Sequence, residues 1–130
     1  MKQTITTILL LAGLFSCVTT RHQSTKPLFG KWDNKSGQIL DFQKDGKAYW
    51  IFYSETKRDT FEIQYRTDFS KKPQEIDLTD FKVGPLQGKT LYGIIEFTDN
   101  KTIRLDFEPT QENRPKEFDQ KQTQTYHKIQ

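Results

Sequence analysis

Residues 89–115 read K-T-L-Y-G-I-I-E-F-T-D-N-K-T-I-R-L-D-F-E-P-T-Q-E-N-R-P, and this stretch decides the fold. Two runs rich in β-branched and aromatic residues flank the turn formers at positions 98–101. In the second run, Ile103, Leu105 and Phe107 alternate with polar residues. Strict alternation is typical of a strand with one buried face and one wet face. The stretch therefore predicts a β-hairpin.

The rest of the chain predicts further strands of the same sheet. Apolar and polar residues alternate over short runs, and turn formers such as Asp45-Gly46 separate them. The expected strands cover residues 28–32, 38–43, 48–53, 60–66, 74–81 and 122–129. About eight short strands without a helical period favour an all-β sandwich or barrel. Hairpin-like links and the need to remove exposed edges favour a small up-and-down antiparallel barrel of lipocalin-like shape over an open sandwich.

The N-terminal residues predict an export signal. Lys2 precedes a short apolar run that ends at Cys17, and such a run is too short to span a membrane. Leu14-Phe15-Ser16-Cys17 resembles the bacterial lipobox, in which the cysteine carries lipid and becomes the mature N-terminus. The alternative is an ordinary secretory signal with Cys17 near its end. Cys17 is the only cysteine of the chain, which also excludes a disulfide framework.

This reading divides the chain into a signal peptide and lipobox (1–17), a polar tether (18–27) and a barrel domain (28–130). Lipid on Cys17 would anchor the protein to a membrane of the cell envelope. Val18 after the cysteine points to the outer membrane, facing the periplasm, if the host is Gram-negative. The formal charge of +3 is spread along the chain without a basic cluster, so a nucleic-acid partner is not expected.

Leu28-x-Gly30-x-Trp32 resembles the Gly-x-Trp signature on the first strand of lipocalins. Further pieces, Pro73-x-x-Ile76-Asp77, Gly93-Ile94-Ile95 and Arg114-Pro115-x-x-Phe118, resemble a bacterial family of lipocalin-like secreted or lipid-anchored domains. That family has a Gly-Ile-Tyr segment where this chain has Gly93-Ile94-Ile95, and it has no settled activity. The resemblance implies that Trp32 closes one end of the barrel, that Gly30 admits another backbone, and that Arg114 caps the indole ring.

Residues able to carry catalysis are sparse. His22 and His127 stand apart, and no cysteine pair accompanies them, so we expect neither a zinc site nor another cofactor. Paired carboxylates for glycoside chemistry would have to come from Asp77 with Asp80, or Asp106 with Glu108. Alternating charge on the wet face of a strand is usually solvation, and no phosphate-binding glycine loop is present. We therefore expect no enzyme and no catalytic residues.

Aromatic residues carry the strongest functional signal. The run 48–53, A-Y-W-I-F-Y, is apolar on both faces, and we expect Trp50 and Phe52 inside the barrel with Tyr49 and Tyr53 outside. The rings can simply fill a small core, or some of them can line a ligand site. The hypothesis of a ligand site predicts that Trp50, Phe52, Tyr65 and Phe97 bind a small apolar or amphipathic ligand. The alternative is a protein-interaction module of the envelope, similar to a lysozyme inhibitor or a maintenance lipoprotein.

Overall fold

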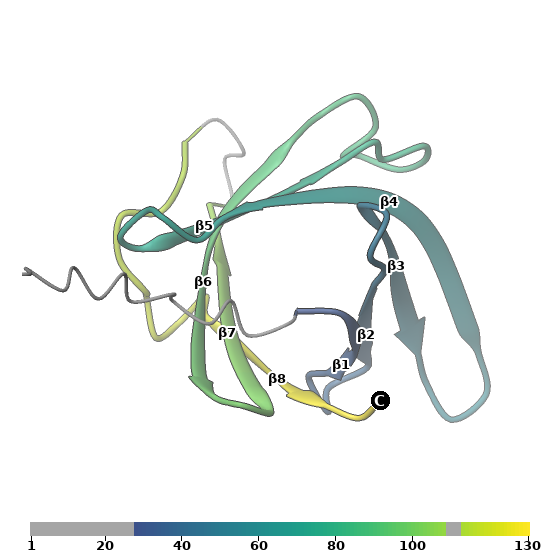
Figure 1. Cartoon of the computed structure of the whole chain (residues 1–130). Coiled ribbons are helices and arrows are strands. Elements are labelled where there is room, and N and C mark those ends of the chain that lie inside the picture. The colour runs from purple at the N-terminus through teal and green to yellow at the C-terminus, as the bar shows by residue number, and fades with distance from the viewer. Residues whose placement is uncertain (1–27, 109–112) are drawn as a thin grey trace, which may run out of the picture.

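A computed structural model describes residues 28–108 and 113–130 of the chain and shows a closed barrel of eight antiparallel strands (Figure 1). The strands follow one another around the barrel in chain order, and β8 closes the ring by pairing with β1. They are β1 (Gly30–Asp33), β2 (Gln38–Phe42), β3 (Lys47–Tyr53), β4 (Arg58–Asp68), β5 (Gln74–Thr79), β6 (Leu91–Asp99), β7 (Thr102–Phe107) and β8 (Gln124–Lys128). The predicted fold class is confirmed. No helix in the described ranges is long and apolar enough to cross a membrane.

The hairpin that the sequence predicted around positions 98–101 joins β6 to β7, with a register irregularity between Phe97 and Asp99. Gly93 on β6 lies opposite Phe107 on β7, and a β-carbon at Gly93 would overlap with the Phe107 ring. Only glycine therefore leaves room for this ring. The strand limits differ from the predicted ones by a few residues at most ends, because pairing with neighbouring strands sets where a strand stops.

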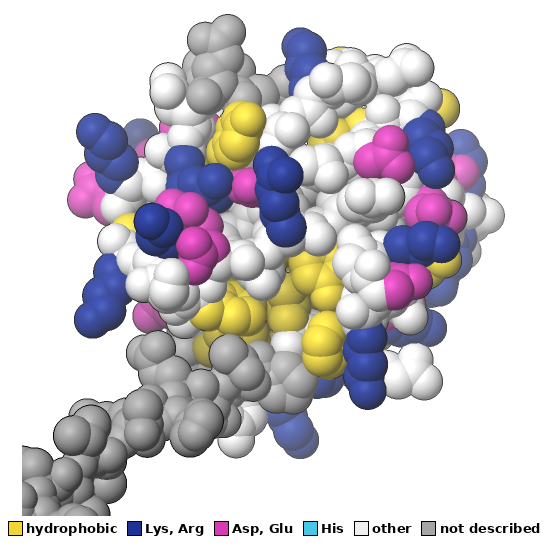
Figure 2. Space-filling view, turned by 45° about the horizontal axis from the view of Figure 1, so that its top comes forward, with side chains coloured by type: hydrophobic (Ala, Val, Ile, Leu, Met, Phe, Trp, Pro, Cys, Tyr) yellow, Lys and Arg dark blue, Asp and Glu magenta, His cyan; other side chains and the backbone are white. Residues whose placement is uncertain are grey.

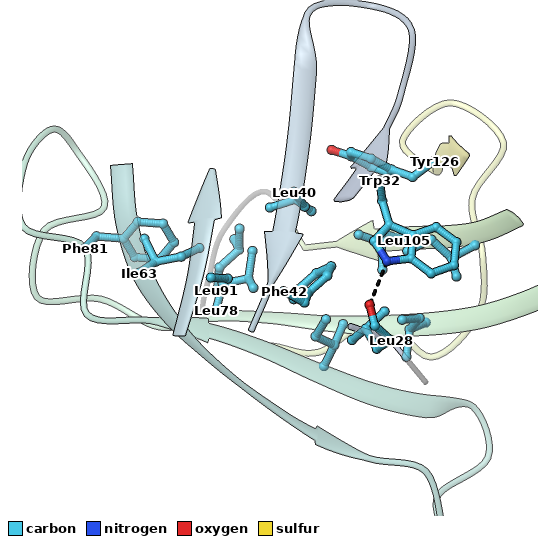
Figure 3. Packing of buried hydrophobic residues seen from close by; sticks show 14 residues of the cluster. Leu28, Trp32, Leu40, Phe42, Ile63, Leu78, Phe81, Leu91, Leu105 and Tyr126 are labelled. Carbon is cyan, nitrogen blue, oxygen red and sulfur yellow. Dashed lines mark hydrogen bonds between the residues drawn. The ribbon is translucent and has the colours of Figure 1, made fainter. Parts of the chain in front are cut away.

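The alternating pattern fills the barrel with side chains. Trp32, Phe42, Ile63, Leu105 and Tyr126 are each 2 % exposed or less and belong to one continuous apolar cluster. Figure 3 shows this cluster, with Trp32 and Leu28 on one side and Ile63 with Phe81 on the other. Such close packing means that any ligand site has to lie toward an end of the barrel rather than along its axis.

Trp32 is completely buried and its indole N–H donates a hydrogen bond of 2.6 Å to the carbonyl oxygen of Leu28 (Figure 3). The cation over its ring is Lys128, whose Nζ lies 5.2 Å from the ring centroid. The expectation that Arg114 caps this ring is wrong, because Arg114 lies over Tyr92 instead. Lys128 takes the position because it pairs directly with Trp32 across β1 and β8.

Gly30 has the role that the resemblance implies. Its φ of +108° lies in the region that side chains disfavour, and a β-carbon there would stand 2.2 Å from the carbonyl oxygen of Gln130. The same oxygen accepts a hydrogen bond of 2.9 Å from the backbone N–H of Lys31. The glycine thus lets the C-terminal backbone close the barrel against β1.

Residues 113–123, which precede β8, lie against the outer wall of the barrel. Asp106 points outward yet is only 1 % exposed, because its Oδ2 accepts hydrogen bonds from the backbone N–H of Asp119 (2.8 Å) and the hydroxyl of Thr123 (3.0 Å). Arg114 reaches β5 and β6, where its Nη1 lies 2.7 Å from Asp77 Oδ1 and donates to the carbonyl oxygen of Gly93 at 2.7 Å. Ile94, which lies opposite Asp106 on the outer face of β6, is completely buried.

Candidate functional site

An apolar pocket of about 480 Å³ opens at one end of the barrel. The end of β3 contributes Trp50 and Phe52, and the start of β4 contributes Phe61 and Ile63. The loop between β5 and β6 forms the opposite wall with Phe81, Lys82, Val83, Gly84, Pro85 and Leu86. Strand direction places this pocket at the end away from the β6–β7 turn, and hence away from the packing between Trp32 and Phe97.

The rings of the pocket hold one another in fixed orientations. Trp50 stacks on Phe52 with 5.2 Å between ring centroids, and Phe52 meets Phe61 edge-on at 5.8 Å. Phe81 reaches across from the loop to lie 6.3 Å from Trp50. The indole N–H of Trp50 donates to Gln38 Oε1 at 3.1 Å, which fixes the plane of the ring that faces the pocket. Offset and edge-to-face ring pairs of this kind are favourable beyond the area that they bury.

The mouth of the pocket combines exposed apolar groups with one ion pair. Phe52 and Phe61 are each 38 % exposed, and Val83 is 58 % exposed. Lys82 Nζ lies 3.8 Å from Glu62 Oε1 at the rim, and both side chains are largely exposed. Large exposed apolar side chains gathered around a hollow are typical of ligand-binding grooves and of protein interaction surfaces.

A second hollow of about 530 Å³ lies at the opposite end, beside Gly30 and Phe42. Its lining also includes the charged residues Lys31, Asp41, Lys44 and Asp45. Phe29 borders it, with Lys44 Nζ 5.8 Å from the ring centroid. This hollow lacks the continuous apolar wall of the first pocket, so the pocket between β3, β4 and the β5–β6 loop is the better candidate for an apolar ligand.

The structure brings together only part of the predicted lining. Trp50 and Phe52 both line the pocket, whereas Tyr65 and Phe97 do not. The Tyr65 hydroxyl donates to the carbonyl oxygen of Gln43 at 2.6 Å, and the ring packs against Phe42. Phe97 packs between Trp32 and Phe69. These two rings are half-buried and pack against the core, because β4 and β6 carry them toward the other end of the barrel.

The pocket also contains residues that the sequence analysis did not single out, namely Phe61 and the loop residues Phe81, Val83 and Leu86. The sequence contains one indication of the loop residues. Residues 81–86 place three large apolar side chains in a stretch that contains Gly84 and Pro85 and has no strand alternation. Apolar side chains in such a loop need a cover or a ligand.

The outer face of β3 is less exposed than its composition suggests. Tyr49 and Tyr53 are half-buried there, and Ile51 is buried beside its cross-strand neighbour Ile39. The Tyr53 hydroxyl donates to Asp33 Oδ1 at 2.8 Å, and this hydrogen bond is the main reason that the pKa of Tyr53 is raised. Trp50 faces into the barrel and Tyr53 faces out, as expected, because Trp50 pairs with the core residue Leu40 of β2.

One member of each candidate carboxylate pair makes structural contacts. Asp77 lies between Arg114 and Arg66, whose Nε is 3.0 Å from Asp77 Oδ2. Asp106 binds the segment outside the barrel, as described above. Within residues 28–108 and 113–130, no group of three or more His, Cys, Asp or Glu side chains is arranged to hold a metal ion.

Surface charge is mixed. Figure 2 shows Lys and Arg side chains interspersed with Asp and Glu side chains over one face of the molecule, with apolar side chains gathered in part of it. Comparisons of the chain with protein-family models, with curated proteins and with solved structures found no match. The site therefore has to be interpreted from its own chemistry.

Proposed function

We propose that this protein is a lipid-anchored module of the cell envelope that holds a small apolar or amphipathic ligand between β3, β4 and the β5–β6 loop. The observation that carries the proposal is the pocket of about 480 Å³ with its wall of aromatic and aliphatic side chains. Sites for small molecules are usually concave, mainly apolar and of this size. The resemblance to lipocalin-like envelope domains supports the fold more than the function, because that family has no settled activity.

The chemistry of the wall suggests how a ligand would lie. An acyl chain or ring system would contact Trp50, Phe61 and Phe81, which offer large apolar faces. A polar head group would remain at the mouth beside Lys82 and Glu62, where water is accessible. Burying a charged head group deeper would cost several kcal/mol, since the inner wall offers few polar partners. An amphipathic molecule fits this division better than a fully polar one.

Titration of the protein with a fluorescent fatty-acid probe tests the proposal. We expect saturable binding with a change in tryptophan emission, because Trp50 lines the pocket. Trp50→Phe should bind the probe but lose most of the emission change. Phe61→Ala should weaken binding by roughly tenfold, because truncating a ring that contacts the ligand removes about 1–2 kcal/mol of apolar contact.

Phe29→Ala is the matched control for Phe61→Ala. Phe29 is also 38 % exposed but lies at the opposite end of the barrel. Its truncation should leave probe affinity unchanged. Absence of saturable binding for fatty acids, haem and hydrophobic dyes would remove the ligand proposal.

The alternative function is recognition of an envelope protein through the same surface. The exposure of Phe52, Phe61 and Val83 at the mouth favours it, because a protein partner would cover these side chains together. Phe52→Ala and Val83→Ser would then abolish capture of the partner. Trp50→Phe, which changes only the half-buried wall, would spare it.

Anchoring through Cys17 is the remaining part of the proposal, and this residue lies outside the described ranges. Residues 18–27 would allow a fully extended reach of about 35 Å between lipid and barrel. Cys17→Ser should abolish lipid attachment and leave the protein uncleaved or soluble. Mass spectrometry and membrane fractionation measure this outcome. Unchanged mature mass and unchanged membrane partitioning in the variant would contradict lipidation.

A further inference from the structure

Part of β4 has a free edge. β4 runs over Arg58–Asp68, but its pairing with β5 covers only Gln64 to Asp68. Thr79 is the last paired residue of β5, and at Asp80, with a φ of 60°, the strand ends and the β5–β6 loop begins. Within the described ranges, no backbone hydrogen bond joins residues 58–63 to the chain that follows Thr79. Half of β4 therefore pairs with a strand, β3, on one side only, and on the other side Lys82 of the β5–β6 loop approaches Glu62 through its side chain, at 3.8 Å. Figure 1 shows the β3–β4 hairpin extending away from β5.

The backbone groups on this free edge can be identified. The N–H of Tyr65 donates to the carbonyl oxygen of Gly46 at 2.9 Å, on the β3 side. Alternate residues of an antiparallel strand direct their backbone groups to opposite neighbours. Ile63 and Phe61 therefore also bond toward β3, whereas Glu62, Thr60 and Arg58 direct their N–H and C=O groups to the free side.

The side chains of Arg58, Thr60 and Glu62 are complementary to those of a second, antiparallel copy of the same strand. All three side chains are exposed. They point outward, because side chains alternate along a strand and Ile63, the residue after Glu62, faces the core. Arg58 and Glu62 stand at equal distances on either side of Thr60. An antiparallel copy of the same strand, related by a two-fold axis at Thr60, would place Arg58 opposite Glu62 of the partner subunit. Thr60 would then face Thr60 of the partner subunit.

We propose that two copies of this protein form a two-fold symmetric dimer by pairing the free edges of β4. About six backbone hydrogen bonds would form between the two edges, together with two Arg–Glu pairs and one Thr–Thr pair. The symmetry makes the interface isologous, so one surface supplies both halves. This proposal does not depend on a ligand in the neighbouring pocket.

Charge favours a two-fold axis at Thr60 over an axis at an adjacent residue of β4. An axis at Asp59 would place two Asp59 carboxylates opposite each other, and an axis at Arg58 would do the same with two guanidinium groups. Like charges directly opposite each other destabilise a strand pair. An axis at Phe61 would direct the partner strand onto Gln64, which already pairs with Thr79. Only the axis at Thr60 satisfies both the charges and the free backbone groups.

The same register covers exposed apolar surface. Phe61 would lie diagonally across from Phe61 of the partner subunit, and diagonal neighbours are within reach of aromatic side chains. The monomer leaves Phe61 and the adjacent Phe52 each 38 % exposed. An uncovered edge beside exposed rings is prone to irregular association, and a closed pair of edges removes that risk.

Sedimentation of the purified full-length protein over a dilution series tests the dimer. We expect a reversible monomer–dimer equilibrium. Arg58→Glu and Glu62→Arg should each raise the dissociation constant by about tenfold or more, because each creates two like-charge contacts. The double variant Arg58→Glu with Glu62→Arg should restore dimerisation, because the opposite charges face each other again. A monomer at every concentration, or a double variant no better than the single ones, would overturn the proposal.

A cross-link provides an independent measurement in intact cells. Thr60→Cys should give a disulfide-linked dimer on a non-reducing gel, since the two residues face each other across the axis. Gln64→Cys is the matched control, because Gln64 is exposed on the same strand but its edge is paired with Thr79. It should not cross-link. Equal cross-linking of both variants, or none of either, would contradict pairing through this edge.

Discussion

Trp32 shows how one residue joins several parts of the barrel. It contacts Leu28 before β1 through a hydrogen bond, Lys128 on β8 through its ring face, and Phe97 on β6 through an edge-on ring contact at 6.3 Å. These three partners come from widely separated positions in the chain. The indole ring therefore fixes the closure of the barrel between its first and last strands.

Trp32→Ala should lower the free energy of unfolding by about 3–5 kcal/mol, because it removes a large, completely buried side chain. Trp50→Ala is the matched control. Trp50 is only half-buried at the pocket, so its truncation should cost clearly less. Urea unfolding followed by circular dichroism measures both values. Equal losses for the two variants would show that burial does not distinguish these residues.

At the scale of elements, the segment of residues 113–123 is held to the barrel mainly by Arg114 and Asp106. Arg114 Nε lies 3.3 Å from Glu75 Oε2, its guanidinium lies 5.4 Å from the Tyr92 ring centroid, and its side chain is only 23 % exposed. A cation in this position joins the segment to β5 and β6 at once. The segment therefore belongs to the folded unit, although it contributes no strand.

Arg114→Ala should lower the free energy of unfolding by roughly 1.5–3 kcal/mol, because several charge-assisted contacts are lost and Asp77 keeps only Arg66. Amide hydrogen exchange should accelerate in residues 113–123 but not in β2 and β3. Lys57→Ala provides the comparison, since Lys57 pairs with Asp59 at a more exposed site away from this segment. Its effect should be about 1 kcal/mol or less. Uniform acceleration over the whole barrel would contradict a local role for Arg114.

For the whole molecule, Tyr126 couples stability to alkaline pH. It is 2 % exposed, its hydroxyl lies 2.8 Å from Gln124 Oε1, and burial, followed by the charge of Asp33, raises its pKa strongly. A group whose pKa is higher in the folded state contributes its full stability below the pKa of the unfolded chain. That contribution is lost as the pH rises above the unfolded value, because the unfolded chain then releases the proton more easily.

The free energy of unfolding should therefore fall as the pH rises above about 10, where an exposed tyrosine ionises. Tyr126→Phe should cost about 1 kcal/mol at neutral pH, because the hydrogen bond is lost. The variant should also show a flatter decline at high pH. Denaturant unfolding over a series of alkaline buffers measures this slope. Ionisation of Tyr126 near its ordinary pKa, without loss of the fold, would contradict the prediction.

Local patterns in the sequence specified the strands and the hairpins that join them. Alternation along β7, the turn formers between β6 and β7, and Asp45-Gly46 before β3 specify strands and hairpins through interactions between near neighbours. Burial of Trp32 is expected from the Gly-x-Trp resemblance, and the inward direction of Trp50 from Tyr49 and Tyr53, whose hydroxyls favour the wet face. These features need no knowledge of distant contacts.

Only the tertiary structure decided which side chains meet across the barrel. Lys128 lies over Trp32 because β8 pairs with β1, and Phe81 faces Trp50 because the β5–β6 loop folds back over β4. Tyr65 and Phe97 point inward as predicted but lie at the wrong end for the pocket. The free edge of β4 likewise arises because β5 is shorter than β4. Alternation fixes which face a residue takes, whereas strand length and register between distant segments fix its height in the barrel and its neighbours.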